Sequence, residues 1–90
     1  MRRTLRRTSQ FKKDYKRAKR AGKPLAVLAE TIRLLQGDQS LPAKRRDHAL
    51  IGNFTGTREC HLAPDWLLIY QLTDDQLILI RLGSHAELFG

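Results

Sequence analysis

The sequence has a single cysteine, Cys60, among its 90 residues. One cysteine excludes an internal disulfide and a zinc site built from several cysteines, and it fits a protein of the reducing cytoplasm. No apolar run approaches the roughly 20 residues that a membrane-spanning helix needs, and no apolar segment of the kind found in secretory signals follows the basic N-terminus. We therefore expect a cytoplasmic protein without a membrane partner, folded as one small domain over residues 1–90.

Acidic residues are scarce: 9 Asp and Glu stand against 17 Lys and Arg, for a formal net charge of +8. The imbalance is concentrated in residues 1–23, which hold eleven of the basic residues and one acid, Asp14. Such a surface favours a polyanionic partner such as nucleic acid, although docking to an acidic protein or plain solvation of a helix face gives the same composition. The candidate phosphate-binding residues are Lys12, Lys13, Lys16, Arg17, Lys19, Arg20, Lys44, Arg45 and Arg46.

Apolar residues recur at helical spacing in two segments of the N-terminal half. After a short strand at 4–7 we predict one helix ending near Gly22 and a second running from Pro24 to Gly37. The short gap between them predicts an antiparallel helical hairpin, packed side by side. The apolar stripe of the first helix consists of Phe11, Tyr15 and Ala18, which we interpret as core rather than as nucleotide-stacking residues.

Strand-forming residues dominate the C-terminal half. We predict strands at 57–62, 65–72 and 76–82, with a tight turn joining the last two into a hairpin, and an irregular connection at 38–50. The predicted fold class is α+β: a small, mostly antiparallel sheet with the N-terminal two-helix hairpin packed on one face.

The register of this hairpin decides which side chains face the helices. A two-residue loop at 74–75 pairs Leu72 with Leu77, Tyr70 with Leu79 and Leu68 with Arg81. The face expected to lie under the helices then contains Leu67, Ile69, Ile78, Ile80 and Leu82. The face expected to stay open contains Trp66, Leu68, Tyr70, Leu79 and Arg81. Placing Arg81 on the open face avoids burying a charge without a partner.

Several polar residues fall in loops and at strand ends, where side chains leave the core, so we expect them to converge at one edge. Cleavage of RNA without a metal needs a base for the 2′-hydroxyl, an acid for the leaving 5′-oxygen and a cation for the charged transition state, which histidine and arginine can supply. Aromatic rings can hold a splayed base. The candidate catalytic residues are His48, His61, Asp65, Arg81 and His85, with Trp66 and Phe89 as candidate substrate-binding residues.

These residues also have simpler interpretations. A lone histidine is more often structural or an incidental surface residue. Three histidines and an aspartate can bind zinc, but the sequence has no HxxxH or HxH spacing, so we predict neither a metal nor another cofactor. Cys60 lies on an alternating strand and is expected to be a small core residue rather than a nucleophile.

Three segments carry a family resemblance: DHAL at 47–50, CHLAPDWLLIY at 60–70 and RLGSHAELF at 81–89. Through them the chain strongly resembles the YafQ-like toxins of the RelE/ParE superfamily of bacterial toxin–antitoxin pairs. The resemblance spans essentially the whole chain. It implies a RelE-like fold and a ribosome-dependent endoribonuclease that cleaves mRNA in the decoding site and inhibits translation.

The resemblance also implies roles for individual residues. His85 and Asp65 would form the proton-transfer pair, with Arg81 on the scissile phosphate. His48 and His61 would orient the substrate or share the proton transfer. The basic N-terminal half would bind ribosomal RNA, and a cognate antitoxin would wrap and silence the toxin.

Two other functions stay open at this point. A ParE-like toxin that is not a nuclease binds a topoisomerase on a similar scaffold and does not need the histidines. A plain RNA-binding module would use the basic helices alone.

Overall fold

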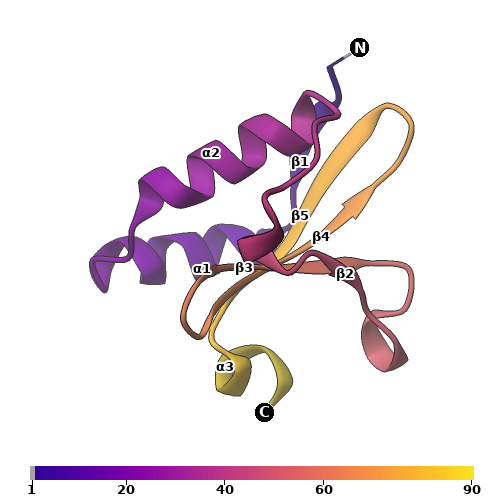
Figure 1. Cartoon of the computed structure of the whole chain (residues 1–90). Helices are drawn as coiled ribbons and strands as arrows, with labels where there is room; N and C mark the ends of the chain where they lie inside the picture. Colours follow the sequence, from indigo (N-terminus) through magenta and orange to yellow (C-terminus); the bar gives the residue numbers. More distant parts are fainter. Residues whose placement is uncertain (1) are drawn as a thin grey trace.

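A computed structural model describes residues 2–90. A five-stranded sheet carries two long helices on one face and a short helix on the other (Figure 1). Its strand order is β1-β5-β4-β3-β2, and every neighbouring pair is antiparallel except β1 and β5. In chain order the elements are β1 (Thr4–Arg7), α1 (Ser9–Arg20), α2 (Leu25–Gln36), the 3-10 turn η1 (Ala43–Arg45), β2 (His48–Ala49), the 3-10 turn η2 (Gly52–Phe54), β3 (Arg58–Ala63), β4 (Trp66–Leu72), β5 (Gln76–Gly83) and α3 (His85–Phe89).

The predicted α+β class is confirmed, and the strands and helices lie within a few residues of their expected bounds. Inside the segment expected to be irregular, the structure adds η1 and the two-residue strand β2. No helix among residues 2–90 is long and apolar enough to cross a membrane.

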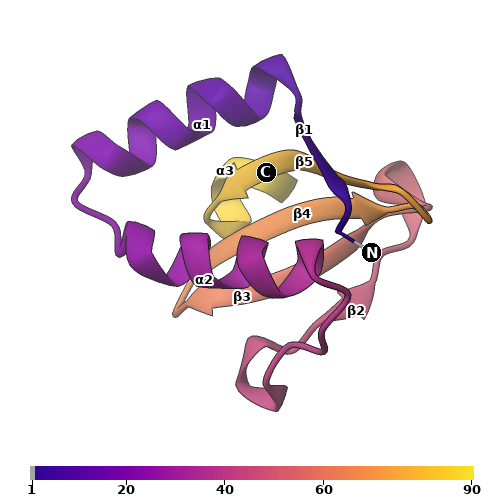
Figure 2. The ribbon, with the colours of Figure 1, turned by 90° about the horizontal axis from the view of Figure 1, so that it is seen from above.

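The two long helices begin and end where the sequence indicates. The Thr8 hydroxyl caps α1 by accepting a hydrogen bond from the Phe11 amide at 3.0 Å, and α2 ends at Gly37. The helices run antiparallel over the same face of the sheet but lie apart, α1 along β5 and α2 across β3 and β5, rather than tightly side by side (Figure 2). Tyr15, expected in the core, is instead 37% exposed.

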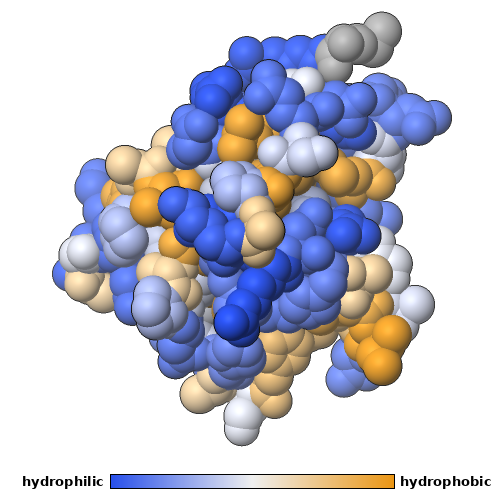
Figure 3. All heavy atoms as spheres, in the orientation of Figure 1, coloured by the Kyte–Doolittle hydropathy of each residue, from blue (hydrophilic) through white to orange (hydrophobic). Residues whose placement is uncertain are grey.

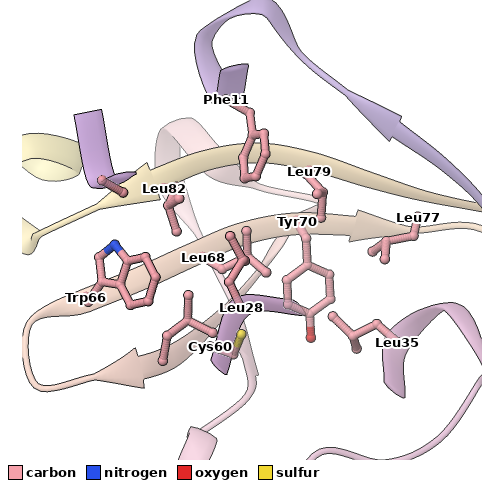
Figure 4. Packing of buried hydrophobic residues seen from close by; sticks show 12 residues of the cluster. Phe11, Leu28, Leu35, Cys60, Trp66, Leu68, Tyr70, Leu77, Leu79 and Leu82 are labelled. Atoms are coloured by element: carbon pink, nitrogen blue, oxygen red, sulfur yellow. The ribbon is translucent and has the colours of Figure 1, made fainter. Parts of the chain in front are cut away.

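The predicted faces of the hairpin are mostly reversed in the structure. Trp66, Leu68 and Leu79 pack with Phe11 and Leu28 under the helices (Figure 4). Leu67, Ile69 and Ile80 lie on the opposite face, where Leu88 of α3 covers them. Residues 66–70 are all buried, so β4 is covered on both faces and its sequence has no polar side to reveal its orientation.

A β-bulge explains the remaining register error. Leu72 pairs with Leu77 and Tyr70 with Leu79 as predicted, but the next pair is Ile69 with Arg81. Ile80 is therefore an extra residue in β5, and the predicted pairing of Leu68 with Arg81 is wrong. Because of this shift Leu82 still faces the helices, as expected.

Arg81 has the buried partner that the sequence did not reveal. Its Nε donates to Asp14 Oδ2 at 2.8 Å, and the Asp14 side chain on α1 is completely buried. The same carboxylate accepts from the Leu82 amide at 3.0 Å and from Arg17 at 3.2 Å. Burial alone would raise the pKa of Asp14, but the hydrogen bonds from Arg81, Leu82 and Gln10 hold that pKa below its ordinary value.

Candidate active site

The three histidines form a row on the sheet face opposite the long helices. His48 lies on β2, His61 on β3 and His85 at the start of α3. The ring centroids of His48 and His61 are 6.4 Å apart, and those of His61 and His85 are 5.9 Å apart. The row continues to Phe89, whose ring lies 6.2 Å from that of His85. The expected convergence of these four residues is therefore present in the structure.

Asp65 holds His85 through both its backbone and its ring. Asp65 occupies the turn between β3 and β4 in the left-handed region, with φ of 53°, and its Oδ1 accepts from the His85 amide at 2.9 Å. The same oxygen lies 2.8 Å from His85 Nδ1. These two hydrogen bonds lower the pKa of Asp65, so the group is a carboxylate at neutral pH. With Nδ1 directed to Asp65, Nε2 is the ring nitrogen left for proton exchange with a ligand.

A capping box fixes the helix that carries His85. The Ser84 hydroxyl accepts from the Glu87 amide at 3.1 Å, and the Glu87 carboxylate accepts from the Ser84 amide at 2.8 Å. Glu87 also forms an ion pair with Arg17 of α1 at 3.1 Å. These contacts tie the orientation of α3 to the helix on the other side of the sheet.

His48 is held from two sides. Its Nδ1 lies 2.7 Å from the Arg46 carbonyl oxygen and its Nε2 lies 3.2 Å from Glu59 Oε2. The preceding residue, Asp47, accepts hydrogen bonds from the Tyr70 hydroxyl and from Arg58 Nε. The loop therefore presents His48 in one defined position.

Glu59 also belongs to this site, although it is not among the residues predicted from the sequence. Glu59 is 5% exposed, and it lies on β3 two residues before His61, on the same face. Glu59 Oε1 lies 3.9 Å from His61 Nε2 and has no hydrogen-bond partner among residues 2–90. The period-2 alternation of a strand, applied to Glu59 and His61, is the sequence signal that would have found it.

The same geometry brings three metal-ligating side chains close together. One ligand atom from each of Glu59, His61 and His85 lies within 4.8 Å of the other two. Carboxylate oxygen and imidazole nitrogen are ligands that zinc and copper accept. The HxxxH and HxH patterns do not reveal this group because the ligands come from separate elements, β3 and α3.

An open concavity of about 680 Å³ adjoins the row of histidines. Asp65, His61 and His85 line it together with the basic residues Lys44, Arg45 and Arg46 of the η1 loop. In Figure 3, hydrophilic residues cover the middle of the view, where Figure 1 draws the loop between α2 and β2. Acid–base groups and cations therefore share one surface depression.

The structure does not place every predicted site residue here. Trp66 is 1% exposed and packs beneath the long helices with Leu68 and Leu82 (Figure 4), so its prediction as a substrate-binding residue is wrong. Phe89, in contrast, is 47% exposed beside His85. Arg81 lies across Ile69 from Glu59 in the sheet, and its guanidinium turns to Asp14 instead of to the histidines.

Cys60 and the basic residues of α1 lie outside the histidine row. Cys60 is fully buried, and burial raises the pKa of its thiol to about 12, as expected for a core residue rather than a nucleophile. Of the basic candidates on α1, Arg17 is engaged by Asp14 and Glu87. The candidates with exposed positions on α1 are Lys12, Lys13, Lys16, Lys19 and Arg20.

Comparison with known proteins identifies the family of this chain. The family model for the bacterial toxin of the type II toxin–antitoxin system, YafQ, matches residues 3–90. The chain belongs to the YafQ family. The mRNA interferase toxin YafQ of Escherichia coli K12 is 43% identical over 84 residues, which are 92% of this chain and 91% of that protein. The family resemblance of the sequence is thereby confirmed.

Solved structures of YafQ and related toxins have the same fold. The toxin in the E. coli DinJ–YafQ toxin–antitoxin complex matches with a TM-score of 0.92 at 41% identity, covering 100% of both chains. A metal-bound toxin from Helicobacter pylori matches with a TM-score of 0.90 at 42% identity, covering 99% of this chain and 100% of that one.

Proposed function

We propose that this YafQ-family toxin is an mRNA interferase that cleaves mRNA in the decoding site of the ribosome by acid–base chemistry. The observation that carries the proposal is the row of three imidazoles with Asp65 bound to His85 Nδ1 at 2.8 Å. Two comparisons support the proposal: the E. coli relative is named an mRNA interferase toxin, and the solved toxin of the E. coli DinJ–YafQ complex has the same fold as this chain.

The proposed reaction forms one bond and breaks one. The ribose 2′-oxygen attacks the adjacent phosphorus while a base removes its proton, and the bond from phosphorus to the 5′-oxygen breaks as an acid protonates that oxygen. The products are a 2′,3′-cyclic phosphate and a free 5′-hydroxyl. His85 and His61, with ring centroids 5.9 Å apart, can flank one phosphate and supply the two proton transfers.

Asp65 has a positioning role in this proposal. Its carboxylate fixes the His85 ring and favours the imidazolium that forms when Nε2 accepts a proton. His48, fixed by Arg46 and Glu59, would orient the substrate at the other end of the row.

The test is primer extension on a defined mRNA programmed into ribosomes, with a ribosome-free control and the His85→Gln variant. We expect cuts at discrete sites with ribosomes, and a loss of about a hundredfold or more in cleavage rate for His85→Gln. Cleavage of bare RNA would support the nuclease activity but exclude its dependence on the ribosome. No cleavage by folded wild-type protein would refute the proposal and favour the ParE-like, topoisomerase-binding alternative.

We also propose a cognate antitoxin as partner, since the E. coli relative forms the DinJ–YafQ complex. The formal net charge of +8 suits an acidic segment of such a partner. Coexpression with the cognate antitoxin should restore growth and yield a complex that co-purifies. Failure of that protein to bind would contradict this part of the proposal.

We further infer that Glu59, His61 and His85 can bind a zinc or copper ion, as the unpartnered Glu59 oxygen and the metal-bound H. pylori toxin suggest. A metal on the imidazole lone pairs would block proton transfer and inhibit cleavage. Calorimetric titration with zinc should show binding that Glu59→Gln weakens about tenfold or more. Equal zinc affinity in Glu59→Gln and wild type would exclude Glu59 as a ligand.

A further inference from the structure

We propose that Lys44 and Arg46 form a binding subsite for the mRNA phosphate next to the one that is cleaved. This inference rests on the proposed nuclease function and specifies how the same site holds its substrate. It assigns the η1 loop to the substrate strand, and not to ribosomal RNA.

The charges of this loop are available to a ligand. Lys44 and Arg46 are exposed, and within residues 2–90 neither side chain has an ion-pair partner. The neighbouring acid, Asp47, is occupied by Arg58 and Tyr70. The two cations therefore lack local neutralisation and present a net positive charge to the concavity.

The backbone of the loop is fixed, so these cations are held close to their working position. The amides of Arg45 and Arg46 donate to the carbonyl oxygens of Pro42 and Ala43, each at 3.0 Å. The Arg45 guanidinium donates to the Leu62 carbonyl at 3.2 Å and anchors the loop to β3. Arg46 adopts a left-handed conformation with φ of 49°, and its carbonyl oxygen contacts His48 Nδ1.

The concavity is large enough to hold more than one phosphate. Its volume of about 680 Å³ lies in the range of roughly 300–1,000 Å³ that accommodates a drug-sized ligand, comparable to a dinucleotide. The proton-transfer residues His61 and His85, and Asp65 that positions His85, line the same space as Lys44 and Arg46. If the scissile phosphate lies against the histidines, a neighbouring phosphate of the same strand lies against the basic loop.

Arg81 does not compete for this role, because its guanidinium is held by the buried Asp14. The η1 loop is therefore the cationic group that shares a concavity with the acid–base residues. An arginine can bind a phosphate with a two-pronged contact and a lysine as a point charge, so the pair suits one phosphate group.

The experiment pairs a protein variant with a chemically altered mRNA. Ribosomes are programmed with mRNAs that carry one neutral methylphosphonate, placed in turn at each phosphate flanking the mapped cleavage site. Single-turnover cleavage is measured for wild type and for Lys44→Ala/Arg46→Ala. The matched control is Arg6→Ala/Arg7→Ala, which removes the same charge from exposed positions outside the concavity.

The expected result is a coupling confined to one phosphate. For wild type and the control variant, one methylphosphonate next to the cleavage site should slow cleavage about tenfold, whereas for Lys44→Ala/Arg46→Ala it should have no further effect. If the loop variant is slow on every mRNA yet remains sensitive to every methylphosphonate, the loop does not contact that strand and the inference is wrong. If wild type cleaves none of the unmodified mRNAs, the proposed function itself fails, and the two failures are thus distinguishable.

Discussion

Replacing Asp14 with asparagine should destabilise the fold by about 3 kcal/mol, because it leaves Arg81 beside a buried group without charge. Loss of one partner from a buried ion pair costs roughly 3–5 kcal/mol, and the 22% exposure of the Arg81 side chain allows some solvation, which favours the lower end. In a domain of this size each kcal/mol lowers Tm by about 4–8 °C. The expected drop is therefore about 12–24 °C.

The pH dependence of stability gives a second signature. The pKa of Asp14 is lower in the folded protein than its ordinary value of about 4. Its contribution to stability is therefore fully present above that ordinary value and is lost as the pH falls through the folded pKa. Asp14→Asn should lose stability at neutral pH and show a shallower decline below pH 4 than wild type.

Urea denaturation at a series of pH values measures both quantities, with Asp38→Asn as the matched control. Asp38 pairs with Arg3 at 3.1 Å, but its side chain is 75% exposed, so this change should cost less than about 1 kcal/mol. A loss below about 1 kcal/mol for Asp14→Asn, or an acid limb unchanged from wild type, would refute the argument. A double-mutant cycle with Arg81→Gln isolates the coupling, expected at about 1–3 kcal/mol.

Three further predictions concern the site and the core. Phe89→Leu should reduce mRNA cleavage with little change in Tm. Trp66→Phe should lower Tm and leave kcat nearly unchanged. Equal effects of the two changes on cleavage would contradict the placement of Phe89 at the site and of Trp66 in the core. Asp65→Asn should lower kcat about a hundredfold and alter the pH profile of cleavage, because the pKa of Asp65 is lowered and the lost group is a carboxylate at neutral pH. A cleavage profile identical to wild type would remove Asp65 from the mechanism. Cys60 is buried and its pKa is raised to about 12, so it should resist iodoacetamide in the folded protein and react in urea. Mass spectrometry would measure the labelling. Rapid labelling without urea would contradict its burial.

Elements and local motifs were predictable from this sequence because they depend on periodicity and on Gly, Pro and capping residues. The orientation of the hairpin was not, because residues 66–70 are apolar on both faces and the bulge at Ile80 shifts the register midway. Arg81 appeared to need an open face because its partner, Asp14, is far away in sequence and lies on a helix whose other polar residues are mainly basic. The histidines were identifiable as residue types, but their alignment depends on strand order and on α3, which local patterns do not encode.

The parallel pairing of β1 with β5 brings Thr4 opposite Gln76, so two distant parts of the chain must meet before the sheet is complete. Contacts of such long separation slow folding relative to local ones. His85, the first residue of α3, follows β5 in the chain and contacts Asp65 directly. In a growing polypeptide the histidine row therefore cannot be complete until residue 85 has been synthesised and has reached Asp65.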